Sequence, residues 1–297
     1  MSRPALEVVI VSHGAEELLR RCLRSLEQNP PSGPHRVTVV DSGSRDGTPD
    51  MVAREFPGVR LVREDNIGFS AANNLVLRAS RAPALLLLNP DTEVRPGTLD
   101  TALDRLESDP ALGMVGCKLV TETGELDHAA KRSFPTPLGA LAHFTGVGRR
   151  GRSPQALSQY RATHLGEDEA GEVDAVNGAF MLVRGDALRE VGPLDEGYWL
   201  YMEDLDWCYR FWQRGWKVFY EPAAVALHVK GGSSGARRRP RQEIAFHRGM
   251  GRFYHKFYAP QRSWLANLAV YLGIGAKLAM SLGITYAGRA LGGRRGK

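Results

Sequence analysis

The sequence predicts an α/β protein with a mostly parallel sheet flanked by helices and a helical appendage at the C-terminus. Three observations support this prediction. Short runs of Val, Ile and Leu alternate with helix-like segments through the first hundred residues, as in parallel sheets that are covered on both faces. The length of 297 residues suits one large domain with an appendage. The end of the chain differs in character, because it is strongly basic and partly apolar.

The predicted elements follow one another in a regular order. Each strand is an apolar run, and each helix has apolar residues three or four positions apart. In the first half we expect strands at 8–11, 37–40, 59–62 and 85–88, with helices at 18–26, after 48, at 68–79 and at 95–107. In the second half we expect strands at 114–120, 179–183, 217–220 and 223–228, with helices from 186 and at 204–214. The segment 145–172 has little periodicity and is expected to be a mobile loop that can act as a lid.

The composition excludes several classes of protein. Hydrophobic residues make up 43% and charged residues 24% of the chain, which excludes a fully disordered chain, a collagen-like repeat and a small disulfide scaffold. The three cysteines, Cys22, Cys117 and Cys208, are far apart, so we expect reduced thiols in a cytoplasmic protein. The apolar run 8–11 is too short for a secretory signal.

The charge is distributed unevenly along the chain. Residues 1–228 contain 25 Lys and Arg against 32 acidic residues, whereas residues 229–297 contain 14 against one. A basic tail predicts an anionic partner, either nucleic acid or an acidic lipid surface. The adjoining apolar segment favours lipid, so we expect no nucleic acid.

That apolar segment, 264–287, is long enough to span a bilayer, but Asn267 and Lys277 interrupt it. A lysine near the centre of a span costs about 2.5–3.5 kcal/mol. We therefore expect a helix that lies at an anionic membrane surface, flanked by the basic residues 237–241 and 294–297. The alternative is a helix that packs on the protein itself.

Polar residues follow each of the first four predicted strands. They are Ser12, Asp41, 64–66 and 89–91. In a parallel sheet the carboxyl ends of the strands meet at one edge, where ligands bind. The topology therefore predicts that these residues share one crevice.

Two of these strand ends suggest nucleotide chemistry. A carboxylate at Asp41 can accept hydrogen bonds from a nucleoside, although a turn or cap role is the alternative. Asp91 follows an apolar strand and suits a divalent cation that is shared with a diphosphate. A turn fixed by the preceding proline is the alternative there.

Three carboxylates lie within four positions at Glu203, Asp204 and Asp206. The functional interpretation is a general base whose pKa is raised by its like-charged neighbours, and the alternative is helix capping. The nearby aromatic residues Trp199 and Tyr201 can form platforms for sugars or belong to the core. His228, at the end of a strand, is a candidate metal ligand, although a packed or surface histidine is the commoner case.

Taken together, these motifs resemble the family 2 inverting glycosyltransferases with the GT-A (Rossmann-like) fold, and within them the bacterial rhamnosyltransferase-like branch. The likeness covers roughly residues 5–235. It is carried, in order along the chain, by 8–13, 39–48, 66–74, 87–93, 177–180, 203–206, 215–216 and 228.

The resemblance implies a role for each matching residue. The nucleotide sugar would be bound by Ser12, His13, Asp41, Asn66, Gly68, Asn73, Asn74 and Asn89. The metal, Mg²⁺ or Mn²⁺, would be held by Asp91 and His228, and the catalytic base would be Asp204. The acceptor would meet Trp199, Tyr201 and Glu203.

The sequence departs from the family pattern at two places. Asn89 stands where the first carboxylate of the metal motif is usual, and 13–14 read His-Gly instead of a frequent Tyr-Asn. The QxxRW motif and the multiple membrane spans of processive synthases are absent from the sequence, so we do not expect long-chain synthesis.

The resemblance also predicts the organisation of the chain and its activity. Residues 1–236 would form the transferase domain, with a nucleotide-sugar half (1–120) and an acceptor half (121–236), and 237–297 would form the tail. The expected reaction is metal-dependent inverting sugar transfer in the synthesis of cell-surface polysaccharide, with dTDP-rhamnose as the first candidate donor and a saccharide or lipid-linked saccharide as acceptor. It would take place in the cytoplasm, on the inner face of the cell membrane.

Three other activities are weighed against this reaction. A UDP-sugar transferase of the same family and a non-catalytic sugar-nucleotide binder are the alternatives. A nucleotidyltransferase is disfavoured, because residues 12–17 form no glycine-rich phosphate loop.

Overall fold

The computed structural model describes residues 5–134, 165–229 and 239–292. The strands are β1 Leu6–Ser12, β2 His35–Ser42, β3 Arg60–Glu64, β4 Ala84–Leu88, β5 Thr92–Val94, β6 Leu112–Val120, β7 Lys131–Arg132, β8 Gly171–Glu172, β9 Ala175–Val176, β10 Phe180–Arg184 and β11 Lys217–His228. The helices are α1 Glu16–Gln28, α2 Thr48–Glu55, α3 Phe69–Leu77, α4 Thr98–Ser108, α7 Gly185–Val191, α8 Glu203–Gln213, α9 Pro240–Phe257 and α10 Trp264–Gly292, with a 3₁₀ turn at Ala259–Gln261.

One large sheet organises the fold, in the strand order β3-β2-β1-β4-β10-β6-β11-β5, with β8 on β11. The first four strands are parallel, as the β-α order predicts. β10 is antiparallel to both β4 and β6, and β11 is parallel to β6. The carboxyl ends of β1, β2, β4, β6 and β11 and the start of β10 therefore lie at the same edge of the sheet.

Strand β1 is buried along its whole length because helices cover both faces of the sheet. Successive side chains of a strand point to opposite faces. Val8 and Ile10 join the main core cluster together with Leu19 and Leu23 of α1. Val9 and Val11 instead join a second cluster with Ala72 and Val76 of α3.

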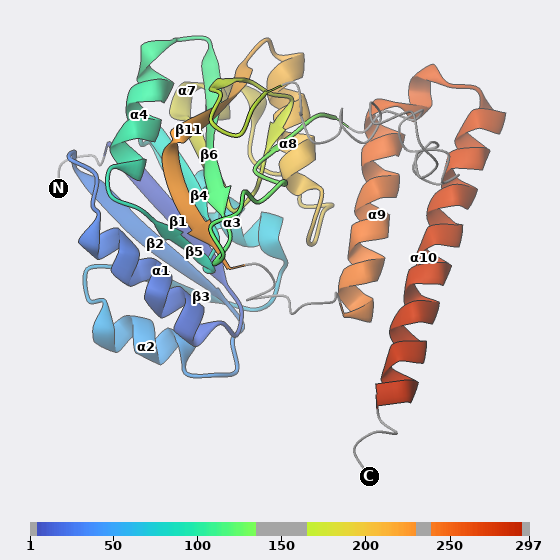
Figure 1. Cartoon of the computed structure of the whole chain (residues 1–297), viewed down its shortest axis with the longest axis horizontal. Helices are drawn as coiled ribbons and strands as arrows, with labels where there is room; N and C mark the ends of the chain where they lie inside the picture. The colour runs from blue at the N-terminus through green and yellow to red at the C-terminus, as the bar shows by residue number, and fades with distance from the viewer. Residues whose placement is uncertain (1–4, 135–164, 230–238, 293–297) are drawn as a thin grey trace.

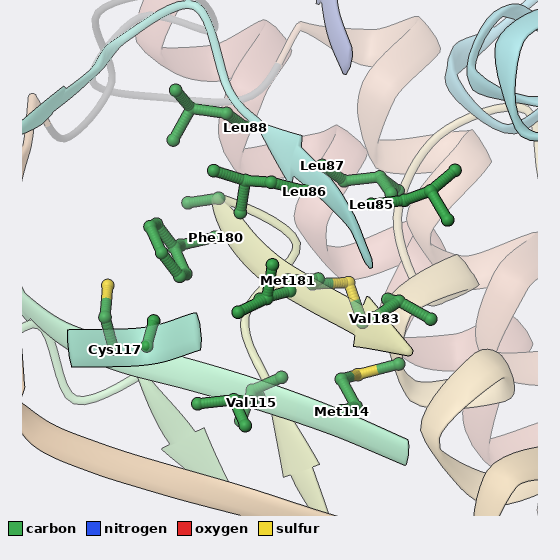
Figure 2. Close-up of a cluster of buried hydrophobic side chains, with 14 of the residues drawn as sticks. Leu85, Leu86, Leu87, Leu88, Met114, Val115, Cys117, Phe180, Met181 and Val183 are labelled. Atoms are coloured by element: carbon green, nitrogen blue, oxygen red, sulfur yellow. The ribbon is translucent and has the colours of Figure 1, made fainter. Parts of the chain in front are cut away.

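The centre of the core lies where β4 meets β10 and β6. Figure 2 shows the leucines of β4 beside Phe180, Met181 and Val183 of β10, with residues of β6 beyond them. The register pairs Leu88 with Phe180, so the end of β4 lies opposite the start of β10. The packing of this apolar centre therefore fixes where the polar residues after β4 lie at the edge of the sheet.

Two of the expected strands, at 217–220 and 223–228, form the single strand β11 with an irregularity between Glu221 and Val225. Pro222 has no N–H for the ladder, which is consistent with a bulge at this point. Thr92–Val94 forms a further short strand, β5, which pairs with β11 in the antiparallel direction. In this pairing Thr92 lies opposite His228. That pairing places the segment after β4 beside the end of β11.

The C-terminal part forms two long helices, which run side by side next to the domain in Figure 1. Helix α9, which was expected only as part of the helical tail 237–297 and without bounds of its own, buries His247, Gly249, Phe253, Tyr254 and Phe257. Helix α10 includes the expected apolar segment, and it packs on α9. Its residues Trp264–Tyr286 are long and apolar enough to cross a membrane, and none of the most apolar window is buried.

Candidate active site

The nucleotide-binding edge starts with Ser12 and Asp41, which the register of β1 and β2 places directly opposite each other. Both are buried, at 0% and 4% exposure. Ser12 Oγ and Asp41 Oδ1 have no hydrogen-bond partner within the described part of the chain. The other carboxylate oxygen, Asp41 Oδ2, accepts a hydrogen bond from the Ser44 backbone N–H at 3.3 Å. Buried polar atoms left unsatisfied are costly, and N–H and O–H groups of a ligand would satisfy them.

The turns after β1, β2 and β3 are joined by His13 and Asn66. His13 Nδ1 lies 2.7 Å from the Ser42 carbonyl, so this nitrogen carries the proton. Asn66 Nδ2 is 3.4 Å from His13 Nε2 and can donate to it. The expected donor residues of these turns are thus in mutual contact.

Gly68, which was expected to bind the nucleotide sugar, packs against Trp199, which was expected to bind the acceptor. It has a φ of 95°, and a Cβ there would lie 2.5 Å from Trp199 Cδ1. The next residue, Phe69, donates its N–H to the Trp199 carbonyl at 2.8 Å. The Arg241 guanidinium of α9 lies over the Trp199 ring, 4.2 Å from its centroid. One face of the expected sugar platform is therefore covered by Arg241.

Asn73 and Asn74 are buried in α3, and their amides bond within the protein. Asn73 Nδ2 donates to the Phe69 carbonyl at 2.9 Å. Asn74 Nδ2 donates to the Leu194 carbonyl and to Glu196, both at 2.9 Å, while its Oδ1 accepts the Leu194 N–H at 3.0 Å. The resemblance implied donor contacts for these residues, whereas in the structure Asn74 fastens the loop that leads to α8.

Asp91 and His228, the expected metal ligands, are brought together by the pairing of β5 with β11. His228 Nε2 lies 3.5 Å from Asp91 Oδ1, and His228 Nδ1 lies 3.0 Å from Asp127 Oδ2. Asp91 and Asp127 are 4% and 1% exposed. Burial acts to lower the pKa of His228, but the hydrogen bonds to Asp127 and Asp91 outweigh it and raise the pKa to about 9.

This arrangement fits a divalent cation in its chemistry. Two buried carboxylates facing one imidazole favour positive charge between them. A carboxylate on the far nitrogen of a metal-binding histidine is a common supporting contact, because it fixes the orientation of the ring. Among the described residues, however, no group of three or more His, Cys, Asp and Glu side chains is arranged to hold a metal.

Asp204, the expected base, lies in the first turn of α8 and is held from the opposite side of the site. Its Oδ2 pairs with Arg132 Nη2 at 2.5 Å and accepts the Gly178 N–H at 3.2 Å. Arg132 is itself held by the Val176 carbonyl at 2.7 Å. The side chains of Asp204 and Arg132 are 13% and 11% exposed, so this ion pair is largely shielded from water.

Glu203, next to Asp204, is more deeply buried, at 7% exposure. Its Oε2 has no hydrogen-bond partner within the ranges that the structure describes. Burial, and after it the negative charge of Asp204, raise the pKa of Glu203 above its usual range. The raised pKa that we expected from clustered carboxylates is found at this residue, which is therefore biased towards its neutral form.

Asp204 and the two candidate metal ligands are connected through the sheet. Gly178, which contacts Asp204, directly precedes Ala179, and the Asn89 N–H donates to the Ala179 carbonyl at 3.0 Å. Asn89 is followed two residues later by Asp91, beside His228. The residues expected from distant parts of the sequence thus converge at one edge of the sheet.

Two residues of this site, Asp127 and Arg132, were not predicted from the sequence. They lie between β6 and β9, in a stretch with no periodic pattern. The stretch 121–134 also contains Glu122, Glu125 and Lys131, so no single charged residue stands out in the sequence. Residues 145–164 of the expected lid 145–172 lie outside the described residues. The same holds for residues 237 and 238 of the basic stretch before α9 and for the basic residues 294–297.

Comparison with known proteins shows the family to which the chain belongs. Residues 7–192 match the family model described as glycosyl transferase family 2. The chain is 31% identical over 254 residues to the N-acetylglucosaminyl-diphospho-decaprenol L-rhamnosyltransferase of Mycobacterium tuberculosis, covering 82% of this chain and 81% of the relative. It is 27% identical over 228 residues to the rhamnosyltransferase WbbL of Escherichia coli, and the match covers 74% of this chain and 82% of the relative.

Solved structures show the same fold. The mannosyltransferase PcManGT from Pyrobaculum calidifontis, in complex with GDP-Man and Mn²⁺, matches with a TM-score of 0.57 at 19% identity, covering 98% of this chain and 81% of that one. GalNAc-T7 with UDP, GalNAc and Mn²⁺ matches with a TM-score of 0.60 at 15% identity, and the match covers 87% of this chain and 49% of that one. These matches confirm the predicted GT-A-like fold.

Proposed function

Because this chain belongs to glycosyl transferase family 2 and is a glycosyltransferase, we propose that it transfers rhamnose from dTDP-rhamnose to a saccharide hydroxyl on a polyprenyl-diphosphate carrier. The choice of sugar and carrier follows the L-rhamnosyltransferase to which the chain is similar over most of both lengths. The observation that carries the chemistry is the position of the Asp204 carboxylate. It is linked through Gly178 and Ala179 to the strand end that bears Asp91.

The reaction is a single displacement with inversion. Asp204 accepts the proton of the acceptor hydroxyl as its oxygen forms a bond to the anomeric carbon. The bond between that carbon and the phosphate oxygen breaks, and the nucleoside diphosphate leaves with the electron pair. Arg132 and Gly178 hold Asp204 Oδ2, which fixes the orientation of the carboxylate throughout.

Ser12 and Asp41 are proposed to receive the nucleoside, because their unsatisfied oxygens are buried side by side at the edge of the sheet. Asp91 and His228 would hold Mg²⁺ or Mn²⁺, with Asp127 fixing the histidine ring. When bound, such an ion supplies positive charge to the departing diphosphate. Phosphate oxygens and water would complete its coordination, which is why two protein ligands suffice.

Glu203 is proposed to contact the acceptor. Its neutral carboxyl can donate a hydrogen bond to a sugar oxygen, and its Oε2 is unsatisfied within the described residues. Tyr201 lies two residues and Trp199 four residues before it in the sequence. Together they would form the acceptor side of the crevice.

Helix α10 is proposed to lie on the anionic inner surface of the cell membrane, where a carrier-linked acceptor is found. Its exposed apolar side chains include Trp264 and Leu272, at 71% and 65% exposure, and Ile284 at 59%. Arg248 on α9 and Arg262 before α10 are exposed basic residues of the same region. Exposed apolar surface next to basic residues is typical of helices at membrane surfaces.

The test uses the full chain in detergent with Mn²⁺ and a short polyprenyl-diphosphate N-acetylglucosamine acceptor. dTDP-rhamnose, UDP-galactofuranose and UDP-glucose are offered in parallel, and the product is identified by mass spectrometry and its anomeric configuration by NMR. We expect a rhamnosylated product with the anomeric configuration opposite to that of the donor.

Transfer from a UDP-sugar alone would refute the choice of donor. Binding of the nucleotide without any release of nucleoside diphosphate, with each acceptor, would identify a non-catalytic binder instead. Asp204→Asn serves as the inactive control for this assay.

A further inference from the structure

We infer that helix α9 is a positioning element for the catalytic carboxylate, and that Gly249 is the positioning residue through which it acts on the turn before α8. The inference rests on the proposed function, because it assigns Asp204 as the base. It concerns a helix that lies beyond the part of the chain matched by the family model, residues 7–192.

The turn that precedes α8 has an unfavourable backbone. Tyr201 and Met202 have φ values of 70° and 72°, and they are the only residues other than glycine with positive φ in the described part of the chain. Met202 is the N-cap of α8, and its carbonyl accepts the Asp206 N–H at 3.0 Å. A positive φ is unfavourable for residues other than glycine, so this backbone conformation persists only where the surrounding structure holds it in place. Any relaxation of the turn would move Glu203 and Asp204 directly.

Helix α9 packs closely against this turn at Gly249. A Cβ at Gly249 would lie 3.0 Å from the Tyr201 carbonyl oxygen, 3.0 Å from Met202 Cγ and 3.1 Å from Met202 Cβ. One turn earlier, the Phe246 ring meets the Tyr201 ring edge to face, with centroids 6.1 Å apart. Glycine at 249 therefore permits a contact between two backbones that a larger residue would push apart.

Charged contacts hold α9 in this position on both sides of the turn. Lys256 Nζ bonds to Asp206 Oδ2 at 2.7 Å, in the first turns of α8, and to Asp195 Oδ2 at 2.9 Å, in the loop before the turn. Arg252 also pairs with Asp195, at 2.8 Å. Because Asp206 is fully buried, the bond from Lys256 is poorly replaced by water. The position of α9 relative to α8 is thus well defined.

Helix α9 also connects the turn to the exposed helix α10. Tyr254 OH donates to Asn267 Oδ1 at 2.7 Å, and His255 Nδ1 lies 3.0 Å from Tyr271 OH. Helix α9 is therefore the element between the proposed membrane-facing helix and the turn that carries the base. A deletion of the whole tail would remove this support as well as the apolar helix.

The test compares Gly249→Ala with Gly251→Ala in the full chain. Both changes add one methyl group to the same helix and gain the same helix propensity. Apart from its chain neighbours and the backbone of its own helix, no heavy atom of the described residues lies within 4 Å of a Cβ at 251, so this variant is the matched control. In the sugar-transfer assay we expect Gly249→Ala to lower kcat roughly 10-fold to 100-fold. The KM for the donor should not change, and Gly251→Ala should match the wild type.

A second measurement does not depend on activity. Hydrogen–deuterium exchange of the peptide 198–206 reports whether the turn before α8 is held, without substrate. We expect faster exchange in Gly249→Ala and wild-type exchange in Gly251→Ala. If the wild-type chain transfers no sugar, the proposed function fails, but this comparison still decides whether α9 holds the turn.

Three results would overturn the inference. They are a wild-type kcat and exchange rate in Gly249→Ala, equal losses in both alanine variants, and a raised donor KM with unchanged kcat. If Gly249→Ala does not fold, Phe246→Leu replaces it, because it removes the ring contact with Tyr201 without adding volume. A smaller fall in kcat, with faster exchange of 198–206, then supports the inference, and wild-type values refute it.

Discussion

Replacing Asp195 by asparagine should weaken the fold in a way that depends on pH. The Asp195 carboxylate accepts bonds from Arg252 at 2.8 Å, Lys256 at 2.9 Å and the Gly197 N–H at 2.9 Å. Burial acts to raise the pKa of Asp195, but the bonds from Arg252 and Lys256 lower it from 3.8 to about 2. The side chain is 17% exposed, so water screens these contacts only in part.

The size of the effect follows from the shift in pKa. One pKa unit corresponds to about 1.4 kcal/mol, so the ionised carboxylate contributes about 2 kcal/mol to the free energy of unfolding. Because the pKa is lower in the folded state, this contribution is complete at neutral pH. It is lost as the pH falls from the unfolded value of 3.8 through the folded value of about 2.

Urea denaturation of the wild type and Asp195→Asn over a series of pH values measures this contribution. The difference in unfolding free energy should shrink by about 2 kcal/mol between about pH 5 and about pH 2. Asp186→Asn is the control, because Asp186 is 74% exposed and pairs with Arg189 on the surface of α7. It should change the unfolding free energy by only about 0.5 kcal/mol. A difference between wild type and Asp195→Asn that stays constant over the whole pH range would refute the reasoning.

Four further changes test the site and the tail. Asp204→Asn should lower kcat by roughly 10²-fold to 10⁴-fold with unchanged donor affinity, measured by calorimetry, and retained turnover would remove it as the base. Asp91→Ala should weaken Mn²⁺-dependent donor binding, and an unchanged Mn²⁺ titration would contradict its role. Asp127→Asn, which leaves the His228 ring less firmly held, should weaken the apparent Mn²⁺ affinity roughly 10-fold to 100-fold, whereas donor binding without metal should stay the same. Deleting 263–297, which retains α9, should abolish flotation with anionic liposomes without changing the exchange of 198–206, and continued flotation would place the membrane contact elsewhere.

The first half of the fold could be predicted because each segment has its own signal. The strand at 8–11 and the helix at 18–26 show the period of their element, and a parallel order follows from their alternation. The direction of β10 could not be predicted, because an apolar run reads the same in parallel and antiparallel pairs. Helix α9 was predicted only as part of a helical tail, and its bounds were not, since its buried face includes His247 and Gly249 and so lacks a continuous apolar stripe.

The positions of the candidate residues could be predicted where a residue follows a strand. They could not be predicted where a residue reaches the site only through a contact with a residue distant in sequence. Asp41 and Asp91 end or follow apolar runs, so topology alone places them at one edge. Asp127 and Arg132 act through contacts with residues 101 and 72 positions away in sequence, which no local pattern encodes. Asn74 has a structural contact that its motif does not indicate. Its position in the motif suggested a ligand contact, and the fold adds hydrogen bonds from its amide to the loop at 194–196.

The three carboxylates at the start of α8 show why only one of them suits the role of base. The electrostatic repulsion among these three carboxylates is not offset by the helix dipole alone, because each of them has different surroundings that reduce its charge or balance it. Asp206 is fully buried between Arg210 at 2.7 Å and Lys256 at 2.7 Å, so it is committed to holding α8 and α9 together. Glu203 is biased towards its neutral form by burial and by the charge beside it, so it can donate a hydrogen bond but is a poor acceptor of a proton. Asp204 has Arg132 as its counter-ion on Oδ2 and keeps 13% of its side chain exposed, which is consistent with its proposed role as the carboxylate that takes a proton from an incoming hydroxyl.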